Sequence, residues 1–285
     1  AAERGHKGTL FDKAQTIGGQ LNLAKMVPGK EEFWGLVDWF SEMLKSSGAE
    51  VKLGEIVTSS DVIDFDEVII ATGVSPRDPK IKGHEKNNVV SYVEVLNGTG
   101  QIGQKVVVIG AGGIGFDVSE YLVHENKSDN KQIEIPKWMK EWGVGDPNKT
   151  PGGLAESGPK PEAAVRQVTL MQRKKQKLGR NLGKTTGWIH RSALKMKNVQ
   201  MIGNVNYEEI TSEGIMVSDG ELRENPRLVS ADTVVICAGQ ESDRSLADEL
   251  IEKGKKVHII GGADVASELD AKRAIDQGVR LAISL

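Results

Sequence analysis

Hydrophobic residues follow two patterns along the chain: short continuous apolar runs and longer stretches with helical spacing. Five short runs are rich in β-branched residues, as are strands buried on both faces of a parallel sheet. They span residues 67–70, 106–109, 168–171, 233–237 and 257–260. Apolar residues at helical spacing occupy 33–44, 114–123 and 269–281. This alternation of strands and helices predicts an α/β fold built on parallel sheet.

The apolar run that ends at Ile109 breaks into glycines before the next helical stretch begins. Gly110, Gly112 and Gly115 stand at G-x-G-x-x-G spacing. Between a strand and a helix, this motif supplies a tight turn, a backbone that can approach a pyrophosphate, and free helical N–H groups that attract anionic oxygens. We therefore expect a dinucleotide here. The alternative is a glycine-rich turn that binds nothing.

The residue after the next strand distinguishes NAD from NADP. Asp129 lies nineteen positions after Gly110, where the acid of an NAD site is expected, but its surroundings have no strand character. The next credible strand, 167–172, ends in Arg173, Lys174, Lys175, Gln176 and Lys177. Arginine and lysine suit a 2′-phosphate, so we expect NADP rather than NAD. The alternative is a solvated run of charge.

The first residues have the pattern of the second half of a nucleotide-binding βαβ unit. A helix end at Gly5 is followed by a strand over 8–12 that closes on Asp12. In such a unit the acid lies about twenty residues after the first glycine, so we expect that the sequence starts inside a domain. Otherwise Asp12 is an ordinary strand-end residue.

Small residues follow several further strands. Thr72 and Gly73 close the run VIIATG, the run TVVICAG repeats that ending, and Gly262 and Asp264 lie in VHIIGGAD. Gly19 and Gln20 form part of the loop IGGQL. Each such ending lets backbone approach a ligand, and each has a plain loop or a helix-proximal acid as its alternative.

Composition narrows the possible partners. The chain of 285 residues is long enough for about two domains, and its net charge of -3 gives no general reason to expect nucleic acid or a membrane as partner. Cys237 is the single cysteine, which excludes a redox-active cysteine pair or a cysteine-ligated iron–sulfur cluster within this chain. Residues 126–161 have the composition of a surface insertion. We expect a cytoplasmic protein.

Six segments together closely resemble the C-terminal part of the bacterial NADPH-dependent 2,4-dienoyl-CoA reductase family, which belongs with trimethylamine dehydrogenase among iron–sulfur flavoenzymes. They are FDK, IGGQL, VIIATG, VVVIGAGGIGFDVSEYL, TVVICAGQE and VHIIGGADVASELDAKRAIDQG. The resemblance implies two Rossmann-like domains, an FAD-binding domain at 1–97 and 236–285 and an inserted NADPH-binding domain at 98–235. It also implies that the FAD domain is N-terminally truncated, without its first strand and glycine loop.

The resemblance assigns cofactor contacts residue by residue. The FAD positions are Asp12, Gly19, Gln20, Thr72, Gly73, Gly262 and Asp264. The NADPH positions are Gly110, Gly112, Gly113, Gly115, Arg173 and Lys174. We expect no catalytic acid or base and no metal ligand in this chain, because the chemistry belongs to the cofactors.

The family implies an electron path from NADPH through FAD and a 4Fe–4S cluster to FMN, which reduces an unsaturated acyl-CoA of fatty-acid β-oxidation. FMN and the cluster are expected only in the missing N-terminal part of the same polypeptide, so this chain alone would be inactive on the acyl-CoA. Two alternatives remain: another flavoprotein with two dinucleotide domains, or a non-catalytic module that binds ADP or another nucleotide. The lone Cys237 argues against thioredoxin-reductase-like disulfide chemistry.

Overall fold

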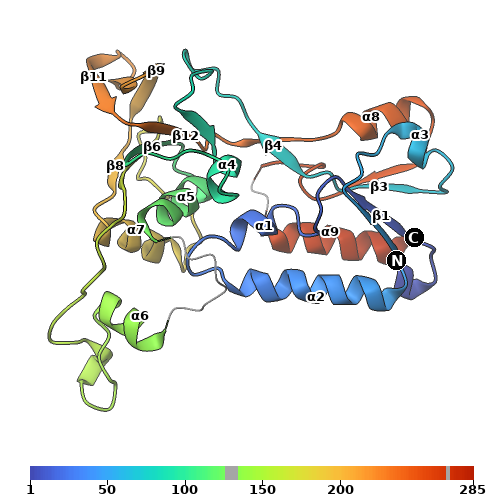
Figure 1. Cartoon of the computed structure of the whole chain (residues 1–285), viewed down its shortest axis with the longest axis horizontal. Helices are drawn as coiled ribbons and strands as arrows, with labels where there is room; N and C mark the ends of the chain where they lie inside the picture. Colours follow the sequence, from blue (N-terminus) through green and yellow to red (C-terminus); the bar gives the residue numbers. More distant parts are fainter. Residues whose placement is uncertain (126–133, 268–269) are drawn as a thin grey trace. The chain divides into compact units, whose positions relative to one another are not determined.

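The computed structural model describes residues 1–125, 134–267 and 270–285 (Figure 1). The chain divides into two compact units. Unit 1 contains residues 1–25, 32–77 and 239–285, and unit 2 contains residues 26–31 and 78–238. Unit 2 is thus formed mainly by one long insertion between two parts of unit 1.

Unit 2 is built on a five-stranded parallel sheet. Its strands, in spatial order, are β5 (Val89–Ser91), β12 (Thr233–Ile236), β6 (Lys105–Ile109), β7 (Gln167–Met171) and β8 (Gln200–Ile202). The central strands β12, β6 and β7 contain the apolar runs from which parallel strands were expected. The predicted α/β fold with parallel sheet is therefore confirmed.

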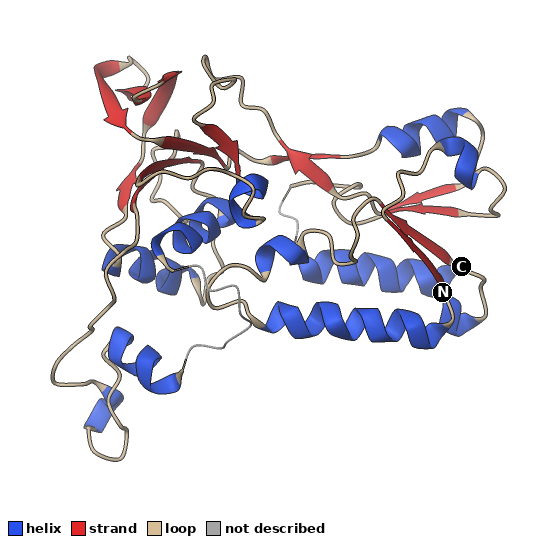
Figure 2. Ribbon diagram, viewed as in Figure 1, coloured by secondary structure: helices blue, strands red, loops and turns tan. Residues whose placement is uncertain are grey.

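The two faces of this sheet are covered by different layers. On one side lie the helices α4 (Tyr92–Leu96), α5 (Gly113–Val123) and α7 (Gly187–Met196), with α5 packed on β6 and β7. On the other side Val107 and Ile109 join a buried core with Ile210 and Ile215. The latter two belong to an antiparallel sheet of β9 (Val205–Thr211), β10 (Gly214–Asp219) and β11 (Glu224–Ser230), in which β10 is central (Figure 2).

The expected surface insertion contains the helix α6 (Ile135–Trp142) and the 3₁₀ turn η2 (Pro151–Gly153). No residue of α6 is buried. Lys197, only 4 % exposed, follows α7 and ties α6 to the unit through an ion pair with Glu141 at 3.0 Å. Asp129, considered above as an NAD-type acid, lies outside the described residues.

Unit 1 contains three separate strand pairs. β1 (Thr9–Asp12) pairs in parallel with β2 (Glu50–Leu53), and β3 (Val68–Ile70) pairs in parallel with β14 (Val257–Ile259). β4 (Val74–Pro76) and β13 (Gln240–Ser242) are antiparallel. Among the described residues, β1 and β3 therefore each have a strand on one edge alone. The 3₁₀ turn η1 (Ala2–Arg4) ends at Gly5 in the left-handed conformation, at the predicted helix end.

Five α-helices lie in the described part of unit 1. They are α1 (Leu21–Ala24), α2 (Glu32–Ser47), α3 (Ser59–Val62), α8 (Ser245–Glu252) and α9 (Ala271–Ser284). A small core joins Val62, Val68 and Ile70 to Ala247 and Leu250 of α8. None of the described helices in the chain is long and apolar enough to cross a bilayer.

The limits of the compact units differ from the domain limits expected from the sequence. Residues 78–97 and 236–238 pack within unit 2. The reason is strand pairing, since β5 lies beside β12 in the parallel sheet with Val90 opposite Val235. The short segment 26–31 also belongs to unit 2.

Candidate functional site

The glycine loop between β6 and α5 contains two glycines that the fold requires. Gly110 has a φ of +106°, and a Cβ there would lie 2.4 Å from the carbonyl oxygen of Cys237. A Cβ on Gly115 would lie 1.8 Å from the carbonyl oxygen of Gly110. The first glycine thus allows β6 to turn beside the end of β12, and the last allows α5 to pack closely on that turn.

The two glycines between them face open space. Gly112 and Gly113 are exposed, and a Cβ on either would meet no atom within 4 Å. Gly112 is the N-cap of α5 and provides no side-chain cap for the first amides of the helix. Unsatisfied helical N–H groups with unobstructed backbone beside them form a site for a phosphate or pyrophosphate. The residues present therefore fit the pyrophosphate of a dinucleotide.

A basic loop lies at the same edge of the sheet. β6 and β7 are neighbouring parallel strands with Ile109 opposite Met171, so the residues after each strand meet at one edge. The side-chain amide of Gln172, a buried residue, donates to the carbonyl oxygens of Lys174, at 3.0 Å, and Gln176. These bonds fix the backbone of the loop while Arg173 and Lys174 remain exposed. The arrangement can offer cations to a bound anion.

Charged groups pack around α5. The Asp117 carboxylate accepts a hydrogen bond from the Lys30 ammonium at 2.6 Å. Burial raises the pKa of Asp117, and the nearby Lys30 opposes that rise. Glu120 lies 3.5 Å from the His190 ring, and this contact raises the pKa of His190 against the effect of its burial. None of these four residues was predicted from the sequence. Asp117 and Glu120 follow the glycine motif on α5, but their partners Lys30 and His190 lie far away in the sequence, where no local pattern indicates the pairing.

Two further residues lie close to the glycine loop. Cys237 is buried, and burial raises the pKa of its thiol far above the ordinary value, so it is an unreactive core residue as its apolar surroundings suggested. Tyr207, on β9, packs against the core beneath the sheet end. Tyr207 was not predicted, because in the alternating sequence VNYEEIT an aromatic residue indicates only a strand face.

In unit 1 the structure brings together four of the seven residues assigned to FAD, at the ends of the adjacent strands β3 and β14. The Thr72 hydroxyl donates to the carbonyl oxygen of Asp243 at 2.5 Å, and Gly73 follows with a φ of +79°. Gly262 and Asp264 follow β14. The side-chain nitrogen of Gln277 donates to the Asp264 carboxylate at 2.9 Å. The side-chain oxygen of Gln277 accepts a hydrogen bond from the backbone amide of Gly261 at 2.7 Å.

The other three residues belong to the strand pair β1 and β2. The Asp12 carboxylate closes β1 by accepting a hydrogen bond from the Ala14 amide at 2.9 Å. Gly19 has a φ of +48°, and Gln20 is the exposed N-cap of α1. In the part of the chain that the structure describes, no hydrogen bond joins Asp12, Gly19 or Gln20 to the ends of β3 and β14.

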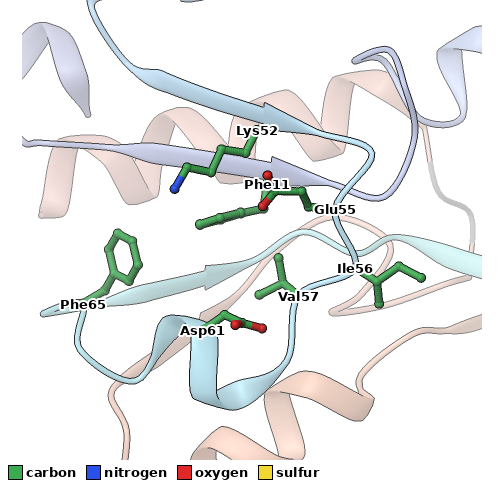
Figure 3. A pocket seen from close by; sticks show the side chains of 7 residues that line it. All are labelled: Phe11, Lys52, Glu55, Ile56, Val57, Asp61 and Phe65. Carbon is green, nitrogen blue, oxygen red and sulfur yellow. The ribbon is translucent and has the colours of Figure 1, made fainter.

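An open pocket of about 490 Å³ lies in unit 1. Figure 3 shows it between β1, which carries Phe11, and the segment that contains Val57, α3 and Phe65. It contains none of the residues assigned to cofactors. Across the described residues, no group of three His, Cys, Asp or Glu side chains is placed to hold a metal ion.

Comparison with known proteins shows the family. Residues 1–259 match the model of the family described as pyridine nucleotide-disulphide oxidoreductase. The metal reductase of Desulforamulus reducens is 27% identical over 269 residues, which cover 92% of this chain and 38% of that protein. The NADH oxidase of Thermoanaerobacter brockii is 37% identical over 131 residues, which cover 44% of this chain and 20% of that protein.

Two solved structures have the same fold. A 2-naphthoyl-CoA reductase aligns with a TM-score of 0.79 at 24% identity, over the whole of this chain and 37% of that one. The thioredoxin reductase of T. acidophilum aligns with a TM-score of 0.64 at 17% identity, over the whole of this chain and 91% of that one. The chain thus spans well under half the length of the metal reductase, the NADH oxidase and the 2-naphthoyl-CoA reductase. It belongs to the pyridine nucleotide-disulphide oxidoreductase family, whose members are FAD- and NAD(P)-dependent flavoprotein oxidoreductases.

Proposed function

We propose that this chain is the NADPH-to-FAD electron-input module of a 2,4-dienoyl-CoA reductase-like iron–sulfur flavoenzyme. The observation that carries the proposal is the edge of the unit 2 sheet, where an open glycine loop and an exposed basic loop follow adjacent parallel strands. In open α/β sheets, ligands bind outside the carboxyl ends of the strands. Unit 2 is therefore the proposed NADPH domain.

In the proposed site, the backbone at Gly112 and Gly113 and the N-terminus of α5 hold the pyrophosphate. Arg173 and Lys174 hold the 2′-phosphate, since a guanidinium can form two parallel hydrogen bonds with phosphate and an ammonium adds point charge. When bound, NADPH supplies a hydride. The residues of this chain bind and orient the dinucleotide, and no side chain is assigned a proton transfer.

Unit 1 is the proposed FAD domain. Asp12 is the last residue of the parallel strand β1. Thr72, Gly73, Gly262 and Asp264 come after the parallel strands β3 and β14, where nucleotide-contacting residues lie. However, unit 1 contains no G-x-G-x-x-G motif of its own.

Strand pairing and exposed apolar surface support an incomplete FAD domain. β1 and β3 each have one strand partner among the described residues, whereas a doubly wound sheet is continuous. The apolar residues Ile275, Val279 and Ile283 recur every fourth position on α9 and are 43%, 53% and 62% exposed. We propose that a strand and its glycine loop outside residues 1–285 complete the FAD site.

The electron-transfer steps after FAD belong, in this proposal, to parts of the polypeptide outside this chain. The proposal puts FMN, the 4Fe–4S cluster and the acyl-CoA site in other parts of the same polypeptide, so this chain alone is inactive on the acyl-CoA of unsaturated fatty-acid oxidation. The likeness in fold to a 2-naphthoyl-CoA reductase supports a CoA thioester as the substrate class. We also propose a cytoplasmic location, because the single cysteine is buried and no disulfide is needed.

The preference for NADPH is tested by substitution of Arg173. Loss of a charge-assisted bond to phosphate weakens binding by roughly tenfold or more. In Arg173→Ala we therefore expect the dissociation constant for NADPH to rise about tenfold and that for NADH to change less than about twofold, by fluorescence titration of the 285-residue chain. Lys195→Ala removes an exposed cation from α7 and serves as the matched control.

The alternative hydride donor is NADH, which appears in the name of one relative, the NADH oxidase of Thermoanaerobacter brockii. Equal affinities of the wild type for NADH and NADPH would contradict the assignment of Arg173 and Lys174 to a 2′-phosphate. Binding of ADP as tight as that of NADPH, with no preference for the dinucleotide, would favour the non-catalytic nucleotide-binding module instead.

A further inference from the structure

The hydroxyl of Tyr207 is a buried polar group without a hydrogen bond. Its oxygen is inaccessible to solvent, and it bonds to no residue that the structure describes. Such a group is unusual, because burial of an unbonded donor or acceptor is costly and each instance calls for an explanation.

The other buried side-chain atoms without a hydrogen bond, among the described residues, differ in kind. They are the Nε atoms of Arg166 and Arg273. Both guanidinium groups form hydrogen bonds through other nitrogens, to Leu122 at 3.4 Å and to Ser267 at 2.7 Å respectively. Tyr207 has a single polar atom in its side chain, so no second atom can form a hydrogen bond in place of its hydroxyl.

The position of this hydroxyl is close to the dinucleotide loop. The ring packs against the core that contains Ile109, Met171 and Ile236, the last residues of β6, β7 and β12. Burial raises the pKa of the Tyr207 hydroxyl, and the charge of Arg173 and the backbone of Gly110 are near enough to oppose that rise. The ring therefore reaches the end of the sheet from which the glycine loop and the basic loop begin.

The backbone around Tyr207 holds it in place. The backbone N–H of Asn204 donates to the carbonyl oxygen of Lys174 at 3.3 Å, and the backbone N–H of Val205 donates to the carbonyl oxygen of Gln172 at 3.4 Å. The start of β9 is thus joined to the basic loop two residues before the tyrosine. The Gly110 amide already donates to Met171 at 2.9 Å, so it is committed elsewhere.

We propose that Tyr207 is a further dinucleotide-binding residue, whose hydroxyl donates a hydrogen bond to a pyrophosphate oxygen of the dinucleotide held at Gly110–Gly115. This inference rests on the proposed function of unit 2. A pyrophosphate oxygen is the acceptor that the hydroxyl lacks, and its negative charge makes the bond a strong one. The contact is common to NADPH and NADH, unlike the contact proposed for Arg173.

The test is titration of Tyr207→Phe with NADPH and with NADH, beside the wild-type 285-residue chain. We expect both dissociation constants to rise by roughly tenfold, because a charge-assisted hydrogen bond is lost. The melting temperature without ligand should stay the same or rise, because the substitution removes an unbonded buried hydroxyl. Tyr121→Phe, on the buried side of α5, is the matched control and should leave both dissociation constants unchanged.

The outcomes separate this inference from the proposed function. If the wild type binds NADPH and Tyr207→Phe binds both dinucleotides equally well, the inference is wrong while the function stands. A loss confined to NADPH would overturn the assignment to pyrophosphate. A wild-type chain that binds neither dinucleotide would overturn both the function and the inference.

Discussion

At the scale of single residues, the glycines of the loop between β6 and α5 have two different roles, close packing and ligand binding. Gly115 is buried against the carbonyl oxygen of Gly110, whereas Gly112, three positions earlier, is exposed with open space where a Cβ would lie. Both positions fit the same motif, yet their local surroundings differ. Substitution by alanine therefore tests the two roles separately.

We expect Gly115→Ala to destabilise the protein by about 3 kcal/mol or more, because the added methyl group overlaps backbone that cannot move aside. Gly112→Ala should change the free energy of unfolding by less than about 0.5 kcal/mol, since its φ is -83° and its Cβ is unobstructed. The same variant should weaken dinucleotide binding, because the methyl group faces the proposed pyrophosphate. Urea unfolding and NADPH titration measure the two effects. Equal stability losses in both variants would contradict the assignment.

The motif was predictable from the sequence because its flanks are a strand and a helix. Spacing alone is not sufficient, since Gly98, Gly100 and Gly103 have the same spacing. Those glycines follow α4 and precede β6, and a Cβ on Gly103 would lie 2.3 Å from the Asp232 side chain. By contrast, the ion pair of Lys30 with Asp117 and the packing of Tyr207 against the core that contains Ile109 join residues far apart in sequence. No local pattern encodes them.

At the scale of elements, the helix α5 carries charges that make stability depend on pH. Glu120 raises the pKa of His190 above its ordinary value of 6.5, so the folded state binds the histidine proton more tightly than the unfolded state does. The resulting stabilisation is fully present below pH 6.5 and is lost as pH rises through the folded-state pKa.

We expect His190→Gln to reduce the free energy of unfolding by up to about 1 kcal/mol at pH 6, because a partly exposed ion pair is screened by solvent. At pH 9 the variant and the wild type should be closer in stability. Urea unfolding at the two pH values measures the difference, with His6→Gln as an exposed control. A stability loss of the same size at both pH values would show that the ion pair is not responsible.

The elements differ in how well the sequence predicted them. Buried parallel strands such as β6 and β12 were found because their apolar runs are continuous. The edge strand β11 was missed, because its side chains are largely exposed and Pro226 interrupts its pattern. Proline is tolerated there because an edge strand has backbone amides that need no partner.

At the scale of the whole molecule, the chain is two units that the sequence partly delimited. The repeated endings VIIATG and TVVICAG predict a chain that leaves one domain and returns, and unit 1 is formed by segments on both sides of residues 78–238. The limits near residues 78 and 238 depend on the pairing of β5 with β12, which no repeat in the sequence records. The family is shown over residues 1–259, while the electron path through both units remains our proposal.

The central claim is that unit 2 binds the nicotinamide dinucleotide at the glycine loop and unit 1 binds the flavin. Hydrogen exchange of the 285-residue chain, measured by mass spectrometry with NADPH or FAD added separately, tests it most directly. We predict that NADPH slows exchange at residues 110–117 and 173–177. Because the proposed FAD site is incomplete in this chain, we predict that FAD slows exchange more weakly, at 70–73 and 257–264. Protection by NADPH confined to unit 1, or no protection at the glycine loop at saturating NADPH, would contradict the account.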